Sequence, residues 1–492
     1  MYTDFMLGTG SLAQRTRRLD YANIGILADY TRIPYAAGST FATQLLHTEF
    51  KRRGHEVTVV GPRAPDAEPG ELPSNYVLFA GVPVRSQPGF YLPLPTIGGL
   101  KALANRRLQM LVGQTGSSLM EAGVWLRLTQ NVPLVCVNTT MLSQVYDVML
   151  PEVLSKNAAM QSFCRRVIVP ILERASVATY NQADGLVVLS KGLERYWRNL
   201  GVKVPIHVIP RSVDPRVARG FVGRDPFDPR AERGKRIIVL CRHVREKGLA
   251  RLIDIFAKHV APKVAGATLT MVGDGADHDS FRSRVERLGL SDRVFFPGEF
   301  PVTEVRNWYA HADVFAYTSL SETYGQVVSE AMWSGLPVVA FDDDAGVAQQ
   351  IRHMKDSLLL PPGPDADVAD AQFGLEVVDL LRRPERRAEL AEAARRSASS
   401  RIEPDACIDR YYQAFDSARM HRDRSPSDVG LVKRVIPIVR WATMHSAAAL
   451  LTRLRPAATL NRHGRRQPGW GDAEIEIETA TAQDTLSSGV AA

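Results

Sequence analysis

Cysteine is scarce in this sequence, which has only four cysteines among 492 residues. They are widely spaced and form no C-x-x-C pair: Cys136, Cys164, Cys241 and Cys407. A disulfide framework and a cysteine zinc site are therefore both disfavoured. This usage suits a reducing compartment, and we expect a cytoplasmic protein, attached at most to the inner face of a membrane.

Long hydrophobic runs are also missing. No apolar run approaches the roughly 18 residues that span a bilayer. Residues 1–20 contain no apolar segment of the kind found in a signal peptide, and we expect them to form an N-terminal arm. The composition is otherwise ordinary, with 45% hydrophobic and 23% charged residues, and the chain is long enough for two or three domains.

Positive charge is concentrated near the end of the chain. The net charge is +8, and residues 431–470 contain eight lysines and arginines without an acid, whereas residues 471–492 contain five acids. The basic segment has apolar residues at partly helical spacing, and Pro437 and Pro456 bracket a candidate helix. Two interpretations stay open: an amphipathic segment on an anionic membrane surface, and a disordered basic tail. Nucleic acid is a disfavoured partner, because no nucleic-acid-binding motif accompanies the charge.

The first half of the chain alternates between strand-like and helix-like segments. An apolar run at residues 23–30 is followed by a helix-like run from Gly38 and by a second apolar run at residues 55–62. Strand, helix and strand within about 40 residues indicate a βαβ unit in a parallel sheet. Further strands are expected at residues 132–138, 185–190 and 206–210.

A segment rich in Pro, Gly, Arg and Asp, residues 211–235, is expected to link two domains. A second α/β series follows, with strands expected at residues 236–242, 267–273, 292–298, 313–319 and 336–342. We therefore predict two doubly wound α/β domains, residues 21–210 and 236–400, with a cleft between the carboxyl ends of their sheets. Residues 401–424 are expected to form a closing helix, and residues 425–492 the basic and then acidic tail.

Two cations follow the first strand of the second domain. Arg242 lies at the end of this strand, and Lys247 lies five residues later in the loop that leads to a helix. Both side chains can face one anion near a helix N-terminus, as a diphosphate would require. Alone the pair is weak support, since arginine and lysine residues at strand ends are usually solvated.

Two glutamates eight positions apart flank a predicted helix start later in this domain. Gly325 indicates a turn, which places Glu322 in the loop and Glu330 in the second turn of the helix. The helix N-terminus between them can hold a phosphate, while the carboxylates accept hydrogen bonds from two sets of hydroxyls. A nucleotide sugar has this order of sugar hydroxyls, diphosphate and ribose hydroxyls. For an isolated pair, an exposed glutamate and a helix-face salt bridge would be the simpler explanation.

Taken in order, these motifs resemble a known family. Arg242 and Lys247, the sequence VGDG at residues 272–275 and the stretch at residues 294–341 closely resemble the C-terminal half of the retaining glycosyltransferases of family 4. Those enzymes have the GT-B fold, in which two Rossmann-like domains face a cleft. The resemblance implies transfer of a hexosyl group from a UDP- or GDP-sugar to a hydroxyl acceptor, with no metal or other cofactor.

The resemblance also implies catalytic roles. Arg242 and Lys247 would neutralise the donor diphosphate, and Glu322 would bond hydroxyls of the transferred sugar near the reaction centre. Catalysis would come from cations and dipoles arranged around the departing phosphate. Gly38 would let the N-terminal loop approach the diphosphate, since a side chain there would crowd it.

Other residues would contact the remaining parts of the donor. Glu330 would accept hydrogen bonds from the ribose hydroxyls, and the turn containing Gly298 and Phe300 would border the base. Backbone N–H groups would contact the phosphate and the sugar from three consecutive residues, Tyr324, Gly325 and Gln326.

The N-terminal half departs from the family pattern. Relatives often carry a His-Thr pair after the strand expected at residues 132–138, where this chain has Asn138 and Thr139. An Asp-x-x-His element is also replaced, within residues 108–126, by a segment that contains Gln109 and Gln114. The family's histidine role therefore cannot be transferred, and Asn138 is the candidate for that position.

Three other functions are alternatives to glycosyl transfer. A Rossmann dehydrogenase would need a strand before the Gly-x-Gly-x-x-Ala run that starts at Gly8, and only seven residues precede it. A sugar-nucleotide 2-epimerase lacks this set of cations and glutamates, and an inactive nucleotide-sugar-binding protein is the alternative outside enzymes.

The stretches at residues 38–43 and 321–332 resemble sulfoquinovosyl- and glucosyl-diacylglycerol synthases, which favours a lipid acceptor. A polysaccharide or a small-molecule acceptor stays open.

Overall fold

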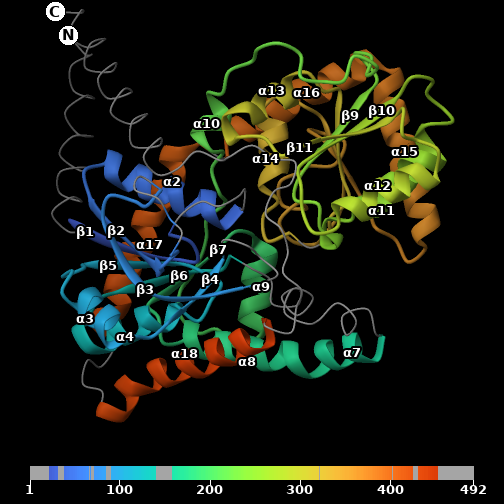
Figure 1. Cartoon of the computed structure of the whole chain (residues 1–492). Coiled ribbons are helices and arrows are strands. Elements are labelled where there is room, and N and C mark those ends of the chain that lie inside the picture. Colours follow the sequence, from blue (N-terminus) through green and yellow to red (C-terminus); the bar gives the residue numbers. More distant parts are fainter. Residues whose placement is uncertain are drawn as a thin grey trace, which may run out of the picture.

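A computed structural model describes residues 21–31, 38–65, 67, 71–84, 90–139, 158–320, 322–401, 403–424 and 430–452. Within them the chain forms two α/β domains, each built on one sheet (Figure 1). The strands of the first domain are coloured from blue to green, and those of the second from yellow-green to gold. The predicted pair of doubly wound domains is therefore confirmed.

An eight-stranded sheet organises the first domain in the order β4-β3-β2-β1-β5-β6-β7-β8, with only the β3–β4 pair antiparallel. Five strands lie where the sequence predicts them, and β3, β4 and β5 were not predicted. β5 lies in the middle of the sheet, with Met110 beside Ile24 of β1. The strands are β1 Asn23–Ala28, β2 Glu56–Pro62, β3 Tyr76–Pro83, β4 Tyr91–Leu94, β5 Met110–Gln114, β6 Leu134–Val137, β7 Gly185–Val188 and β8 Ile206–Val208.

Helices cover both faces of this sheet. On one face Phe50 of α2 packs in a cluster with Ile24 and Ile26, and on the other Leu126 of α4 and Leu193 of α9 pack in a cluster with Leu27. The chain thereby buries both surfaces of a nearly all-parallel sheet. The helices are α2 Gly38–Arg52, α3 Ile97–Ala104, α4 Met120–Gln130, α7 Ala158–Phe163, α8 Val169–Tyr180 and α9 Lys191–Asn199, and a π-helical turn, η1 Cys164–Ile168, joins α7 to α8.

The second domain contains a six-stranded parallel sheet in the order β11-β10-β9-β12-β13-β14. Its strands are β9 Arg236–Leu240, β10 Thr268–Val272, β11 Val294–Gly298, β12 Val314–Tyr317, β13 Val338–Phe341 and β14 Leu358–Leu360, and only the three-residue β14 was not predicted. The helices that accompany it are α10 Pro215–Ala218, α11 Leu249–Ile255, α12 His278–Arg287, α13 Val305–Ala310, α14 Gln326–Trp333, α15 Ala366–Arg382 and α16 Pro384–Ser399.

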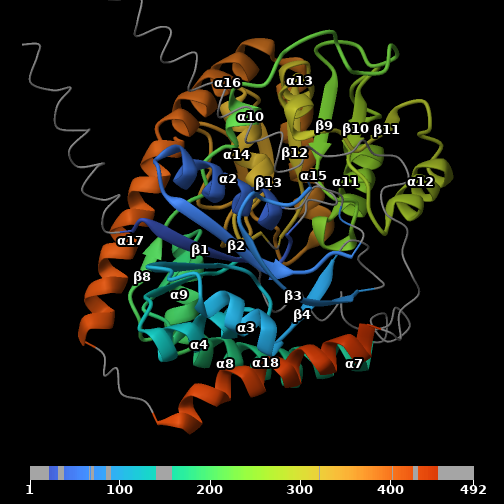
Figure 2. The same cartoon turned by 60° about the vertical axis from the view of Figure 1, so that its left-hand side comes forward.

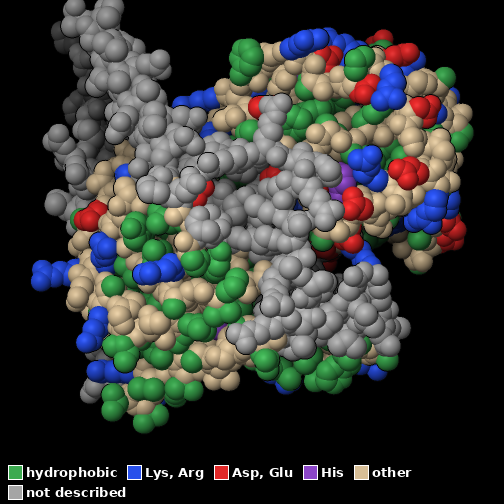
Figure 3. Space-filling model, in the orientation of Figure 1, with side chains coloured by type: hydrophobic (Ala, Val, Ile, Leu, Met, Phe, Trp, Pro, Cys, Tyr) green, Lys and Arg blue, Asp and Glu red, His purple; other side chains and the backbone are tan. Residues whose placement is uncertain are grey.

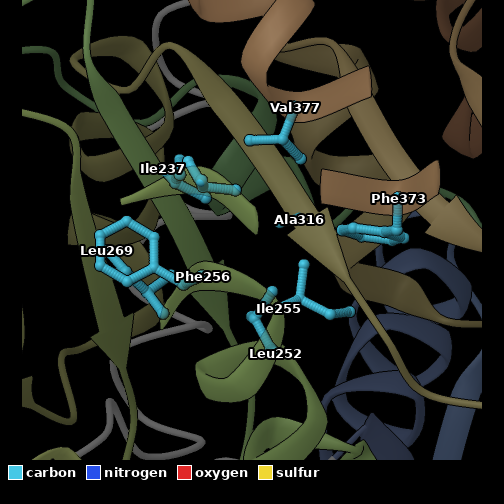
Figure 4. Close-up of a pocket in the computed structure, with 9 residues that line it drawn as sticks. Ile237, Leu252, Ile255, Phe256, Leu269, Ala316, Phe373 and Val377 are labelled. Atoms are coloured by element: carbon cyan, nitrogen blue, oxygen red, sulfur yellow. The ribbon is translucent and has the colours of Figure 1, made fainter. Parts of the chain in front are cut away.

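The core of the second domain contains a small apolar pocket between the sheet and helices α11 and α15 (Figure 4). Ile237 and Leu269 line it from the sheet, Leu252 from α11 and Phe373 from α15. All of its lining side chains are hydrocarbon, so no polar group is present to orient a ligand. We interpret this pocket as a packing gap, separate from the candidate site.

After the second domain the chain returns to the first (Figure 2). Helix α17 (Pro404–Arg424) packs against the first sheet, where Tyr412 Oη lies 2.7 Å from His55 Nε2 and Tyr21 Oη donates to Asp416 at 2.7 Å. Helix α18 (Leu431–Thr452) packs on α4 and β4. The polypeptide therefore passes between the two domains twice, once before β9 and once before α17.

Helix α18 covers the first part of the basic segment and is anchored by a buried tryptophan. The Trp441 ring meets Phe79 at a centroid distance of 4.9 Å, and its Nε1 donates to the Pro93 carbonyl at 2.7 Å. The helix starts at Leu431 and contains Pro437 rather than beginning after it. A proline here removes one intrahelical N–H, a loss that the packing of the helix outweighs. Residues 453–470, which complete the predicted basic segment, lie outside the described residues.

The start of α15 supplies a testable stability prediction. Asp365 caps this helix, accepting hydrogen bonds from the N–H groups of Asp367 and Val368 at 2.9 and 3.3 Å. We expect Asp365→Ala to lower the free energy of unfolding by about 1 kcal/mol. Urea unfolding of the full chain measures this, and Asp365→Asn, which keeps a capping oxygen, should unfold near the wild-type midpoint. Equal losses in both variants would contradict the capping role.

Candidate active site

The candidate site lies at the carboxyl edge of the second sheet, where the strand order reverses. β9 and β12 are neighbours there, although the chain passes through β10 and β11 between them. Such a switch point opens a crevice because the loops after the two strands leave in opposite directions. Arg242 follows β9 and Glu322 follows β12, so the fold brings these two loops together from about eighty residues apart.

Lys247 and Glu322 form an ion pair at this point. The Lys247 Nζ lies 2.5 Å from Glu322 Oε1, and both side chains are mostly buried. The hydroxyls of Tyr317 and Ser319 donate to the same oxygen at 2.6 and 2.8 Å. None of these three bonds uses Oε2, the second carboxylate oxygen.

Electrostatics keeps this carboxylate ionised. Burial raises the pKa of Glu322, but the Lys247 ammonium and the two hydroxyls lower it by more, so the pKa lies below its usual value. A carboxylate held in this way is a fixed acceptor for a hydroxyl group. It is not arranged as a proton donor at neutral pH.

The loop after β12 ends at the N-terminus of α14. Gly325 precedes the first helical residue, and its φ of 76° lies in the left-handed region that favours glycine. The loop is held by a bond from the Gly346 N–H to the Glu322 carbonyl at 3.1 Å, and Gln350 Nε2 donates to the Tyr324 carbonyl. The first N–H groups of a helix have no partner within the helix, so this end suits an anion.

Glu330 lies in the second turn of α14, as the sequence predicts, and is buried. Tyr309 of α13 donates to its Oε2 at 3.2 Å. Burial, and after it the nearby Asp214 carboxylate, raise the pKa of Glu330 to about 8 against the opposing effect of hydrogen bonds from Tyr309 and Gln326. Glu330 is therefore mostly protonated at neutral pH, in contrast to Glu322.

The remaining donor-side residues line the same edge of the sheet. Arg242 is partly exposed, with its guanidinium 3.9 Å from Glu246. Gly298 ends β11 with a φ of 93°, and its carbonyl accepts from the Gly273 N–H at 2.8 Å. Phe300 packs edge-on against Trp308 at a centroid distance of 5.0 Å.

The first domain meets this site through the segment after β6. Thr323 Oγ1 lies 3.5 Å from the Thr139 carbonyl, and Gln326 Nε2 donates to the Ser212 carbonyl at 3.0 Å. Asn138 is buried beside Thr139, and its Nδ2 lies 3.4 Å from Tyr180 Oη. Gly38 begins α2, whereas residues 32–37 before it lie outside the described residues.

Sequence reasoning missed the residues that tune the two glutamates. Tyr317 and Ser319 bond Glu322, while Tyr309 and Asp214 act on Glu330. Tyr317 and Ser319 could have been found, because they lie at the end of a predicted strand, five and three residues before Glu322. Tyr309 and Asp214 come from other elements, and no spacing in the sequence connects them to Glu330.

Comparison with protein families accounts for both halves of the chain. The model for Glycosyltransferase Family 4 matches residues 38–217, and the model for Glycosyl transferases group 1 matches residues 224–397. The chain belongs to glycosyltransferase family 4. It is therefore a retaining glycosyltransferase that uses a nucleotide sugar, and the predicted family and enzyme class are confirmed.

Curated proteins similar to this chain have names that give different activities. An α-monoglucosyldiacylglycerol synthase of Streptococcus pneumoniae is 23% identical, over 64% of this chain and 70% of that protein. A GDP-mannose-dependent α-mannosyltransferase of Mycobacterium tuberculosis is 28% identical, over 76% of this chain and 92% of that protein. An exopolysaccharide phosphotransferase of Streptomyces coelicolor is 30% identical over 52% of this chain. The matched segment spans only a quarter of that protein.

Solved structures confirm that this family 4 chain has the GT-B fold. A crystal structure of Anabaena HepE in complex with UDP and glucose covers 81% of this chain and all of its own, with a TM-score of 0.60 and 18% identity. A crystal structure of WaaG, a glycosyltransferase involved in lipopolysaccharide biosynthesis, covers 78% with a TM-score of 0.56. At such identities the likeness concerns the fold.

Proposed function

We propose that the protein transfers a hexosyl group from a UDP- or GDP-hexose to a hydroxyl acceptor and retains the anomeric configuration. The observation that carries this proposal is the grouping at the β9–β12 switch point. A buried Lys247–Glu322 ion pair lies beside the N-terminus of α14, and Arg242 follows the neighbouring strand. Cations and N–H dipoles suit a diphosphate, and carboxylates suit hydroxyl groups.

In this proposal the diphosphate binds between the two cations and the first turn of α14. An ammonium has three N–H donors, so Lys247 can keep its bond to Glu322 while it donates to a phosphate oxygen. Glu322 Oε2 then accepts a hydrogen bond from a hydroxyl of the transferred hexose. Lys247 thus binds the diphosphate while Glu322 binds the hexose. Their ion pair fixes the hexose relative to its leaving group.

The bond that breaks joins the anomeric carbon to a diphosphate oxygen, and its electron pair leaves on the nucleotide diphosphate. The acceptor oxygen bonds the anomeric carbon on the same face and loses its proton to the departing phosphate or to solvent. Negative charge grows on the leaving oxygen. Arg242, Lys247 and the α14 N–H groups are placed to stabilise that charge before it forms.

The other donor contacts follow the same geometry. Glu330 accepts hydrogen bonds from the ribose hydroxyls, and the turn from Gly298 to Phe300 borders the base. Gly38 gives the diphosphate room on the side of the first domain. Asn138, next to the Thr139–Thr323 contact, is proposed on the hexose or acceptor side.

A lipid hydroxyl is the proposed acceptor. Support comes from the sequence resemblance to diacylglycerol glycosyltransferases and from the relative in Streptococcus pneumoniae whose name gives a diacylglycerol product. A glycan acceptor is the alternative, which the Streptomyces relative named for an exopolysaccharide favours.

A donor and acceptor screen tests the proposed function. The purified full chain is incubated with UDP-glucose, UDP-galactose or GDP-mannose, and nucleotide diphosphate release is followed with diacylglycerol micelles or a soluble glycan. We expect one donor to dominate, micelles to raise its turnover, and EDTA to leave the rate unchanged. The anomeric proton of the product, seen by NMR, should keep the donor's configuration. No release from any donor would overturn the proposal.

A further inference from the structure

Helix α18 presents an apolar surface to solvent on the side opposite its buried Trp441. Leu431, Val435 and Val439 recur every four residues, so they share one face of the helix, and they are 76%, 46% and 56% exposed. Val432 and Ile436 form a neighbouring exposed row. Five large aliphatic side chains in nine residues thus face water on an element whose other side buries Trp441 and His445.

A second exposed apolar row lies on the segment from α7 through η1 to α8. Phe163, Val167 and Ile171 also recur every four residues, and all three are exposed. This segment is separated from α18 by about 260 residues of sequence. Both nevertheless pack against the same support, because α8 and α18 each contact α4.

The two rows lie on one side of the molecule. Figures 1 and 2 both place α18, α8 and α7 together beneath the first sheet, along the lower edge of the molecule. The space-filling view shows hydrophobic side chains gathered at that edge, over α18 on the left and over α7 on the right (Figure 3). We call this set of side chains, on α18 and on the α7–α8 segment, the basal face.

Basic side chains accompany these apolar rows. Three cations, Lys433, Arg434 and Arg440, belong to α18, which contains no acid, and Arg440 is paired with the buried Glu121. The α7–α8 segment contains three exposed arginines and one acid, Glu173, which accepts a hydrogen bond from Tyr196. The arginines are Arg165, Arg166 and Arg174.

We propose that the basal face docks the protein on an anionic lipid bilayer, with the exposed aliphatic and phenylalanine side chains inserted between headgroups and the basic side chains on the lipid phosphates. Exposed apolar rows flanked by cations are the pattern that binds a negatively charged interface. A second copy of the chain fits poorly, because two basic faces would repel each other. No helix in the described part of the chain is long and apolar enough to cross the bilayer, so docking is peripheral.

The basal face is inferred from the exposure and charge of its side chains. Only its purpose, the delivery of a lipid acceptor, rests on the proposed function. The inner side of α18 anchors the helix to the first domain. His445 Nε2 accepts from the Ser118 N–H at 3.2 Å, and the N–H of Gly116, two residues earlier, donates at 3.0 Å to Asp29, which follows β1. Substitutions on the exposed side leave these contacts in place.

Vesicle co-sedimentation of the full chain tests the proposal without any sugar or activity. We expect binding to vesicles of phosphatidylglycerol and phosphatidylcholine in equal parts, and weak binding to phosphatidylcholine alone. Val435→Glu with Val439→Glu should lower the affinity about tenfold or more, and so should Phe163→Glu with Val167→Glu. A matched control is Val368→Glu with Leu375→Glu, since both residues are exposed on α15 of the second domain. This control should bind like the wild type.

Several results would overturn the basal face. Unchanged binding in the α18 variant, or loss in the α15 control as well, would contradict it. Loss in the α18 variant but not in the α7–α8 variant would overturn the two-part surface. Sedimentation velocity of the wild type and the α18 variant adds a further test. A wild-type dimer that is lost in the α18 variant would show that a second copy of the chain, and not a bilayer, covers the basal face. Circular dichroism confirms folding, and binding that persists in an enzymatically silent protein supports the docking while rejecting the function.

Discussion

Lys247→Ala is expected to lower kcat/KM for hexosyl transfer by about 10²–10³-fold. The ammonium lies 2.5 Å from Glu322 and, in the proposed complex, also contacts the diphosphate. Its loss removes a cation from the developing charge on the leaving group. It also leaves a buried carboxylate without its counter-ion. Steady-state transfer assays with the donor identified in the screen measure the effect.

The pH profile of this variant separates a chemical role from loss of folding. In the wild type, Lys247 and two hydroxyls hold the pKa of Glu322 below its usual value against the opposing effect of burial. Without the ammonium, burial is less opposed and this pKa rises. The residual activity of the variant should therefore decline toward acidic pH over a range in which the wild-type rate stays level.

Lys258→Ala supplies the matched control, since Lys258 is an exposed lysine on the same domain. It should leave both the rate and the pH profile unchanged. Near-normal turnover in the Lys247 variant would show that this lysine is not part of the donor site. A fall in thermal stability large enough to unfold the variant at the assay temperature would be recognised by circular dichroism, and Lys247→Arg then gives a folded variant for the same assay.

The positions of the candidate residues in the fold are predictable where these residues follow the ends of strands. Arg242, Lys247 and Glu322 follow β9 and β12, and both strands are continuous apolar runs that local patterning identifies. β5 was missed although all five of its residues are buried, because Gly113 and the polar Gln114 weaken the apolar pattern. β14 is too short to produce a pattern.

Other features depend on contacts between distant segments and were not predictable from spacing. The basic segment at residues 431–470 suggested a helix, but contacts such as that of Trp441 with Phe79 are needed to show that α18 has a packed side and an exposed side. The protonation of Glu330 likewise depends on Asp214, 116 positions earlier in the chain. Sequence patterns do not distinguish the protonation states of Glu322 and Glu330, whereas their environments move the two pKa values in opposite directions.

That difference leads to a second expected result: the affinity for the donor should rise with pH up to about pH 8. With its pKa raised to about 8, Glu330 carries a proton in the free protein at pH 7. The ionised carboxylate accepts two hydrogen bonds from a ribose diol, so donor binding favours ionisation. Well below this pKa, each pH unit should weaken binding by up to about tenfold. Titration calorimetry with UDP or GDP in two buffers of different ionisation enthalpy should detect release of a proton on binding at pH 7.

Two substitutions sharpen this result. Asp214→Asn removes a charge that raises the pKa of Glu330, so the rise in affinity should move to lower pH, while the asparagine can still cap α10 as Asp214 does. Glu330→Gln should weaken nucleotide binding by about 10²-fold and abolish both the pH dependence and the proton release. Proton release that persists in the Gln variant would assign the titration to another group.

The same carboxyl should also cost the free protein stability. Its pKa is raised above the value expected in the unfolded chain, so the native state holds a proton that the unfolded state has lost between about pH 4.5 and pH 8. The free energy of unfolding therefore falls as pH rises through this interval. Glu330→Gln removes this term and should melt at a higher temperature than the wild type at pH 8, with little difference at pH 4.5. A variant that binds the nucleotide less well yet unfolds at a higher temperature would show that Glu330 is kept for binding the donor and not for the fold.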